Sequence, residues 1–127
     1  MSEAALRDAI SKYIECYNSF YIDEMIDLFE ENCIFQNVSN SSGTVECKGK
    51  EPLRSFAKQN ASMFQERQQI ITNWIVSNNK VAVEVDFSAK MACDFPTGLK
   101  KGDHIECKGM SVFEFESGKI KRLVDFS

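Results

Sequence analysis

The sequence has one histidine, and its five cysteines include no Cys-x-x-Cys pair. Zinc sites are built from closely spaced cysteine and histidine ligands, and disulfide frameworks use an even number of cysteines. We therefore expect neither a metal site nor a disulfide framework. Unpaired cysteines are typical of a reducing compartment, which favours a cytoplasmic location.

A basic surplus and a long apolar run are also missing. The net charge is −4 at pH 7, whereas a protein that binds nucleic acid needs a basic surface for the phosphates. No apolar stretch approaches the roughly 18 residues of a membrane-spanning helix, and the N-terminus carries no apolar signal segment. We expect no nucleic-acid partner, no membrane insertion and an intracellular protein.

Phenylalanine, in contrast, is abundant, with ten residues in a chain of 127. A chain of this length has room for one domain and one core. We therefore predict a single domain over residues 1–127. So many aromatic rings in a small domain indicate a phenyl-lined core or cavity.

The first half of the chain shows helical periodicity. Apolar residues recur every three to four positions over residues 3–19, which predicts a helix. A second, shorter helix is expected to end at Glu31-Asn32, followed by a short strand over 33–38 and a polar loop over 37–44. A third helix is expected to begin at Gly49-Lys50-Glu51-Pro52, because proline is tolerated in the first turn.

The second half alternates between apolar and polar residues. The alternation predicts strands over 68–77 and 80–92, then a hairpin with arms over 103–116 and 120–126. Strands this long must bend to fit a small domain, and Gly109 is a candidate position. The fold class is α+β, with three helices packed on a strongly curved, mostly antiparallel sheet in the order α-α-β-α-β-β-β-β.

Four local patterns follow one another along the chain: Tyr13-Ile14-x-x-Tyr17-Asn18, Asp23-x-x-Ile26-x-Leu28-Phe29, Gly49-Lys50-Glu51-x-Leu53-Arg54-x-Phe56 and Phe113-x-Phe115-x-x-Gly118-Lys119-Ile120. In this order they resemble the cone-shaped superfamily named after nuclear transport factor 2, in its SnoaL-like and ketosteroid isomerase-like branch. The resemblance implies a cone fold with an internal pocket. It also implies a homodimer formed through the outer face of the sheet.

The resemblance assigns candidate site residues. Ketosteroid isomerases have a tyrosine in the first helix, matched by Tyr13, but their general-base aspartate is matched by Asn37 and a second aspartate by Ser111. Asparagine cannot abstract a proton, so isomerisation by that route is not implied. SnoaL-like cyclases carry an acidic residue in the last strand, and Asp125 matches it. Their histidine has no equivalent, since strand parity puts His104 on the other face.

We predict Asp125 as the acid/base, with Tyr13 and Asn37 donating hydrogen bonds to an enolate. An apolar pocket would raise the pKa of Asp125 and make it a usable base near neutral pH. The predicted ligand pocket comprises Tyr17, Phe35, Phe56, Asn60, Phe64, Phe87, Ser111, Phe113 and Leu123.

Simpler roles remain open for the same residues. Asp125 could be exposed or ion-paired near the chain end, and Tyr13 could be an ordinary core residue. Asn37 could cap the polar loop that follows it. Asn60 could bond to a buried group of the protein, and Ser111 could only fill space.

Two functions are therefore expected as alternatives. The first is a cofactor-independent isomerase, cyclase or hydrolase that acts on a small apolar carbonyl compound. The second is a non-catalytic module that binds a small hydrophobic molecule or only dimerises.

Overall fold

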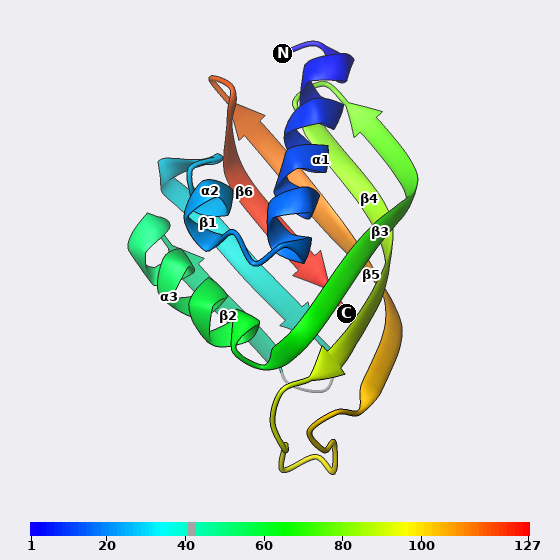
Figure 1. The fold of residues 1–127 in the computed structure, drawn as a ribbon. Coiled ribbons are helices and arrows are strands. Elements are labelled where there is room, and N and C mark those ends of the chain that lie inside the picture. The colour runs from blue at the N-terminus through cyan, green and yellow to red at the C-terminus, as the bar shows by residue number, and fades with distance from the viewer. Residues whose placement is uncertain (41–42) are drawn as a thin grey trace.

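Helices and a curved sheet form two layers in the computed structural model, which describes residues 1–40 and 43–127. The helices are α1 (Glu3–Asn18), α2 (Ile22–Ile26) and α3 (Lys50–Ala61), and they cover one face of the sheet (Figure 1). The strands are β1 (Phe29–Ser39), β2 (Gly43–Lys48), β3 (Phe64–Ser77), β4 (Lys80–Met91), β5 (His104–Glu116) and β6 (Lys119–Phe126).

The six strands form one mixed sheet in the order β2-β1-β6-β5-β4-β3. Strand β6 pairs in parallel with β1, and every other neighbouring pair is antiparallel. The last strand of the chain therefore lies in the middle of the sheet. The long strands curl around the helices in Figure 1. The predicted fold class, helices packed on a strongly curved and mostly antiparallel sheet, is confirmed.

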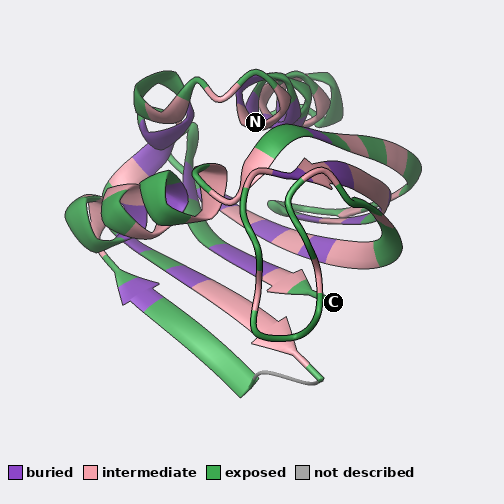
Figure 2. Ribbon diagram, turned by 60° about the horizontal axis from the view of Figure 1, so that its bottom comes forward, coloured by how far each residue is buried: buried purple, intermediate pink, exposed green. Residues whose placement is uncertain are grey.

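Helix α1 lies across the concave face of the sheet. It begins after Ser2, whose hydroxyl accepts a hydrogen bond from the Ala5 backbone N–H at 3.1 Å and so caps the first turn. Leu6, Ile10 and Tyr13 recur at helical spacing and are buried against the sheet, while the opposite side of the helix faces solvent (Figure 2). The apolar stripe of the sequence is thus the inner face of this helix.

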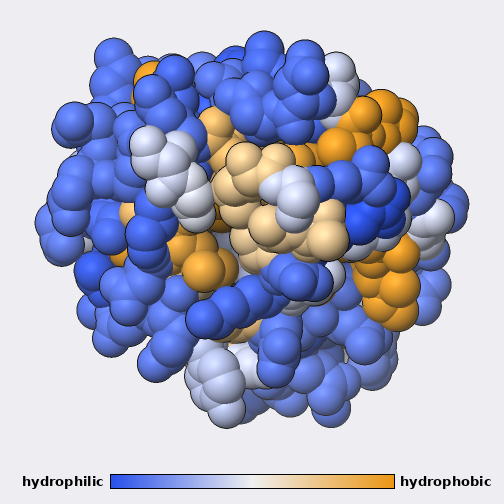
Figure 3. All heavy atoms as spheres, turned by 90° about the horizontal axis from the view of Figure 1, so that it is seen from above, coloured by the Kyte–Doolittle hydropathy of each residue, from blue (hydrophilic) through white to orange (hydrophobic). Residues whose placement is uncertain are grey.

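The core fixes the position of one aromatic side chain from α1. Phe29 and Phe113 are almost completely buried, and both meet the Tyr13 ring edge-on, with centroid separations of 5.9 and 5.4 Å. Edge-to-face contacts of this kind stabilise a defined ring orientation. The apolar core therefore holds Tyr13 rigidly. The surface of the molecule seen from above, in contrast, is mainly hydrophilic (Figure 3).

Several local predictions were wrong. Residues 43–48 form strand β2, although residues 37–44 were expected to be a loop, and residues 41–42 of that loop lie outside the described part of the chain. This edge strand buries only Cys47, so it carries almost no apolar alternation. Helix α2 ends at Ile26 rather than at Glu31-Asn32, because Phe29 already pairs with β6.

The third helix begins where it was predicted, at Lys50 after Gly49. It ends at Ala61, and Phe64 is the first residue of β3. Gly109 does not interrupt its strand, because it pairs in regular register with Val85. A Cβ atom there would lie 3.0 Å from the Phe126 carbonyl oxygen. Glycine at this position therefore allows β6 to approach closely.

The curvature coincides instead with irregular pairing. Register shifts occur between Phe29 and Ile34 in β1, between Ile71 and Asn73 in β3, and between Glu114 and Phe115 in β5. Bulges increase the local twist of a strand, so these positions account for the coiling of the sheet. None of the helices within the described residues has the length and apolar character needed to cross a membrane.

Candidate functional site

A cavity of about 260 Å³ lies between the helices and the concave face of the sheet. Its walls come from all three helices and from the strands β1, β3, β4, β5 and β6, and aromatic side chains are prominent among them. The volume is close to the lower end of the roughly 300–1,000 Å³ typical of small-molecule sites. The cavity therefore has room for a small organic molecule.

Most of the predicted site residues meet at this cavity. The lining includes all three predicted catalytic residues and seven of the predicted pocket residues: Tyr13, Asn37, Asp125, Tyr17, Phe35, Phe56, Asn60, Phe64, Phe87 and Ser111. Phe113 and Leu123 are on the correct face but fully buried, and they are not part of the lining. Strand parity assigns a face, whereas depth along the strand depends on how the helices pack.

Three polar side chains stand in one row across the concave face. Asn37, Asp125 and Ser111 are direct partners on β1, β6 and β5. Since paired residues project to the same side of a sheet, the backbone pairing itself places these groups side by side. The Ser111 hydroxyl donates a hydrogen bond to Asp125 Oδ1 at 2.6 Å. The acid thus has a fixed partner within the protein.

Burial raises the pKa of Asp125 to about 6, from a usual value of 3.8. The hydrogen bond from Ser111 acts in the opposite direction, since it favours the charged carboxylate. The side chain lines the cavity and is only partly exposed. A carboxyl group with this pKa is mainly ionised at pH 7 and exchanges a proton easily, which suits acid/base chemistry.

Two tyrosines of α1 face the same cavity. Burial raises the pKa of Tyr13 well above its usual value, and the charge of Asp125 is the next largest cause. Burial also raises the pKa of Tyr17, and Arg67 opposes this effect. Both phenols therefore stay protonated at neutral pH and can donate a hydrogen bond into the cavity.

The lining residues that were not predicted from the sequence include two polar side chains of β3, Arg67 and Gln69. They lie in a polar run, Gln65-Glu66-Arg67-Gln68-Gln69, that shows no apolar alternation. Counting back in steps of two from the partly buried Ile71 would have put both side chains on the inner face. Arg67 is 5% exposed, and its Nη1 donates to Asn60 Oδ1 at 3.0 Å, which gives Asn60 a partner.

Other candidates lie outside the cavity. His104 is exposed at the start of β5 and does not line the cavity. Within residues 1–40 and 43–127, no cluster of three or more histidine, cysteine or acidic side chains could hold a metal ion, and all five cysteines are free.

The helices and the curved sheet form a cone around a cavity that contains the Asp125 carboxyl group. The sequence pattern of the SnoaL-like domain matches residues 10–123, so the chain belongs to the SnoaL-like domain family. A comparison with curated protein sequences gave no match.

Solved structures of the same fold are similar over nearly the whole chain. A proposed polyketide cyclase from Xanthomonas campestris has a TM-score of 0.81 and 16% identity, covering 98% of this chain and 90% of that one. A phenazine biosynthesis-related protein from Pseudomonas aeruginosa has a TM-score of 0.80 and 21% identity, covering 97% and 75%. A protein of ketosteroid isomerase-like fold from Catenulispora acidiphila, in complex with trimethylamine, has a TM-score of 0.77 and 12% identity, covering 94% and 84%. At these identities the similarity establishes the fold.

The raised pKa of Asp125 predicts a pH-dependent stability. Between pH 3.8 and about 6 the folded protein keeps a proton that the unfolded chain releases, so the free energy of unfolding falls as the pH rises. The total loss is at most about 3 kcal/mol and levels off above the folded pKa. Urea unfolding of the wild type and of Asp125→Asn across this pH range measures the loss, as the difference between their curves of unfolding free energy against pH. Parallel curves would contradict the prediction.

Proposed function

We propose that this SnoaL-like protein binds a small, mainly apolar carbonyl compound and acts on it without a cofactor, as an isomerase, cyclase or hydrolase. The observation that supports the proposal is the Asp125 carboxyl group, which lines an aromatic cavity and has a pKa of about 6. A base with such a pKa balances ionisation against proton affinity near neutral pH.

The chemistry assigned to the site begins with proton abstraction. The Asp125 carboxylate takes a proton from the carbon next to the ligand carbonyl, and the electron pair of that C–H bond moves to the carbonyl oxygen as an enolate. Tyr13 and Asn37 donate hydrogen bonds to the enolate oxygen, where negative charge develops. The protonated Asp125 then returns the proton to the same or another carbon, which completes an isomerisation or accompanies ring closure.

The first test is the pKa of Asp125, measured by carboxyl-carbon NMR during a pH titration. We expect a value near 6 for the wild type, because burial disfavours the charged form. In Ser111→Ala the value should rise further, since the hydrogen bond that stabilises the carboxylate is lost. A wild-type value near 3.8 would remove the basis of the proposed chemistry.

The alternative is a non-catalytic protein that binds the same class of ligand. Asn37 in the position of the isomerase base and the distance of His104 from the cavity favour it. The two functions differ in one measurement, the exchange of ligand protons adjacent to the carbonyl with deuterium from solvent. A binder protects or leaves these protons unchanged, whereas the enzyme accelerates their exchange.

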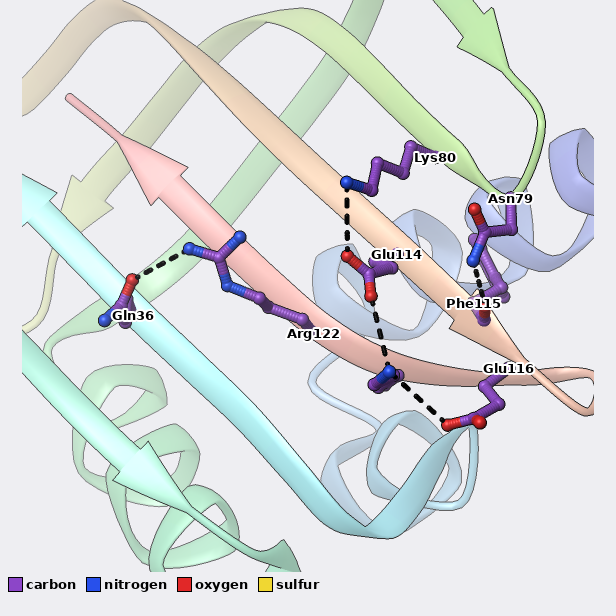
Figure 4. Close-up of polar contacts among 8 residues, drawn as sticks. Gln36, Asn79, Lys80, Glu114, Phe115, Glu116 and Arg122 are labelled. Carbon is purple, nitrogen blue, oxygen red and sulfur yellow. Dashed lines mark hydrogen bonds and ion pairs between the residues drawn. The ribbon is translucent and has the colours of Figure 1, made fainter.

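We further propose that two copies associate through the outer face of the sheet. Two rows of paired residues cross that face. One row comprises Val38, Phe126 and Met110 and continues into Glu84, and the other, mainly apolar, comprises Gln36, Val124, Val112, Ala82 and Ile75. Beside them Glu114 lies between Lys80 and Lys121, at 3.7 and 3.6 Å (Figure 4). Mixed charges around an apolar centre suit contact between identical surfaces related by a two-fold axis.

The association is tested by sedimentation equilibrium. We expect a dimer for the wild type and a monomer for Val112→Lys, since this substitution puts a charge in the mainly apolar row. Tyr21→Lys, at an exposed position before α2, adds the same charge elsewhere and should leave the dimer intact. A monomeric wild type would contradict the proposal.

We also propose a cytoplasmic location, which the five free cysteines support. Given the net charge of −4, we propose that the protein has no nucleic-acid partner.

A further inference from the structure

Arg67 is a buried cation at the end of the cavity formed by β3. Its guanidinium carbon lies 3.7 Å from the centre of the Tyr17 ring and 4.7 Å from that of Phe20. Its Nε donates to the Tyr17 carbonyl oxygen at 2.9 Å, near the C-terminal end of α1, where a positive charge is favourable. None of the ion pairs among residues 1–40 and 43–127 involves Arg67. The charge therefore has no carboxylate partner in the described protein.

One arm of this guanidinium is unsatisfied. Arg67 Nη2 is buried and has no hydrogen-bond partner within the described residues, and the same is true of Gln69 Oε1. Hydrogen bonding from both side chains to the Tyr17 phenol lowers the pKa of that phenol, whereas the atoms Arg67 Nη2 and Gln69 Oε1 themselves have no partner. A buried charged donor without an acceptor is costly, so its persistence at a cavity wall points to an acceptor supplied by a ligand.

The polar groups of the cavity are arranged in a sequence from Asp125 to Arg67. The charge of Asp125 affects the pKa of Tyr13 more than that of Arg67 does, whereas for Tyr17 the order is reversed. The Tyr17 ring contacts the guanidinium directly, with its centre 3.7 Å from the guanidinium carbon, whereas the Tyr13 ring packs against Phe29 and Phe113. The shifted pKa of Asp125 has no contribution from Arg67. Asp125 lies on β6 and Arg67 on β3, and strands β5 and β4 separate these two strands in the sheet, so the two charged groups lie on different sides of the cavity.

We propose that the ligand of this cavity is an apolar carboxylic acid, or another molecule with a terminal anionic oxygen, whose anion binds Arg67 while its reacting carbonyl lies beside Asp125. The position of the reacting carbonyl beside Asp125 rests on the proposed function, whereas the anion site at Arg67 does not. The Nη2 donor of Arg67 takes the anion, and Gln69 Oε1 accepts a hydrogen bond from a hydroxyl or amine of the ligand. Arginine binds carboxylates strongly because the interaction is a charge-assisted hydrogen bond.

Matched acids and amides test the anion site. The probes are benzoylpropionate, cyclohexaneacetate and hexanoate, each compared with its primary amide by isothermal titration calorimetry at pH 8. The acid of at least one pair should bind about tenfold or more tightly than its amide, because only the acid forms the charge-assisted hydrogen bond. Arg67→Gln should reduce that acid to the affinity of the amide.

Arg7→Gln is the matched control, since Arg7 also stacks on an aromatic ring, that of Trp74 at 5.0 Å, but is not part of the cavity lining. It should keep the preference for the acid. Because Arg67→Gln also loses the contacts to Asn60 and Tyr17, nitrogen NMR of the Arg67 guanidinium in the wild-type protein provides a second measurement. Its resonances should shift with the acid and remain in place with the amide.

The failure of this inference is distinguishable from failure of the proposed function. Equal affinity for acids and amides, or no binding of any acid, would overturn the anion site and assign Arg67 a purely structural role. Asp125-dependent proton exchange in a neutral ketone would still support the proposed enzyme. Conversely, a strong preference for acids without proton exchange would support the anion site in a non-catalytic binding protein.

Discussion

Replacing Asp125 by asparagine is expected to lower turnover by about a hundredfold to ten-thousandfold while leaving ligand affinity within a few-fold of the wild type. Loss of a positioned general base has an effect of this size. Asparagine has nearly the same shape and can still accept a hydrogen bond from Ser111, so the cavity should keep its form. The measurement is the rate of deuterium exchange into a ketone ligand, together with its dissociation constant by calorimetry.

Ser111→Ala serves as the comparison for this variant. It removes the hydroxyl that touches Asp125 but retains the carboxyl group, so exchange should continue with a pH profile displaced to higher pH. If Asp125→Asn and the wild type exchanged protons equally fast, Asp125 would not be the base. Equal rates together with unchanged ligand affinity would favour the non-catalytic binding protein.

Replacing Phe113 by alanine is expected to lower the free energy of unfolding by about 3–5 kcal/mol. The ring is completely buried and contacts the rings of Tyr13 and Phe115. Its removal would leave a cavity that the surrounding strands can fill only in part. Urea unfolding followed by circular dichroism measures the loss. We also expect weaker ligand binding, since Tyr13 would lose one of its two edge-on aromatic contacts.

Tyr21→Ala is the control for this experiment. It deletes an aromatic side chain of similar size that is 57% exposed, and it should change the free energy of unfolding by less than about 1 kcal/mol. A loss below about 1 kcal/mol for Phe113→Ala as well would show that the core under Tyr13 is not tightly packed.

The elements that bury a regular apolar stripe could be predicted from the sequence. Leu6, Ile10 and Tyr13 marked α1 through their helical spacing, and the valines of β4 marked a strand through their alternation. Strand β2 escaped prediction because an edge strand with one buried side chain has no such pattern. Local propensity is weakest as a guide where little apolar surface is buried.

The site was partly predictable for a related reason. Asp125 stood out because it interrupts an otherwise apolar or basic strand, and its register with Asn37 and Ser111 follows from the pairing of β6 with its two neighbours. Arg67 did not stand out, since polar residues surround it in the sequence. Its burial depends on the coiling of β3 over α1, which arises from long-range packing.

The central position of β6 has a consequence for how the protein is made. Strand β1 emerges early during synthesis, but its inner neighbour β6 follows only after α3, β3, β4 and β5. Until then one edge of β1 has no strand to pair with and can pair with another chain. Pairing between such distant segments slows folding. The nascent protein is therefore most vulnerable to aggregation just before residues 119–126 appear, and a chaperone that shields β1 would raise its yield.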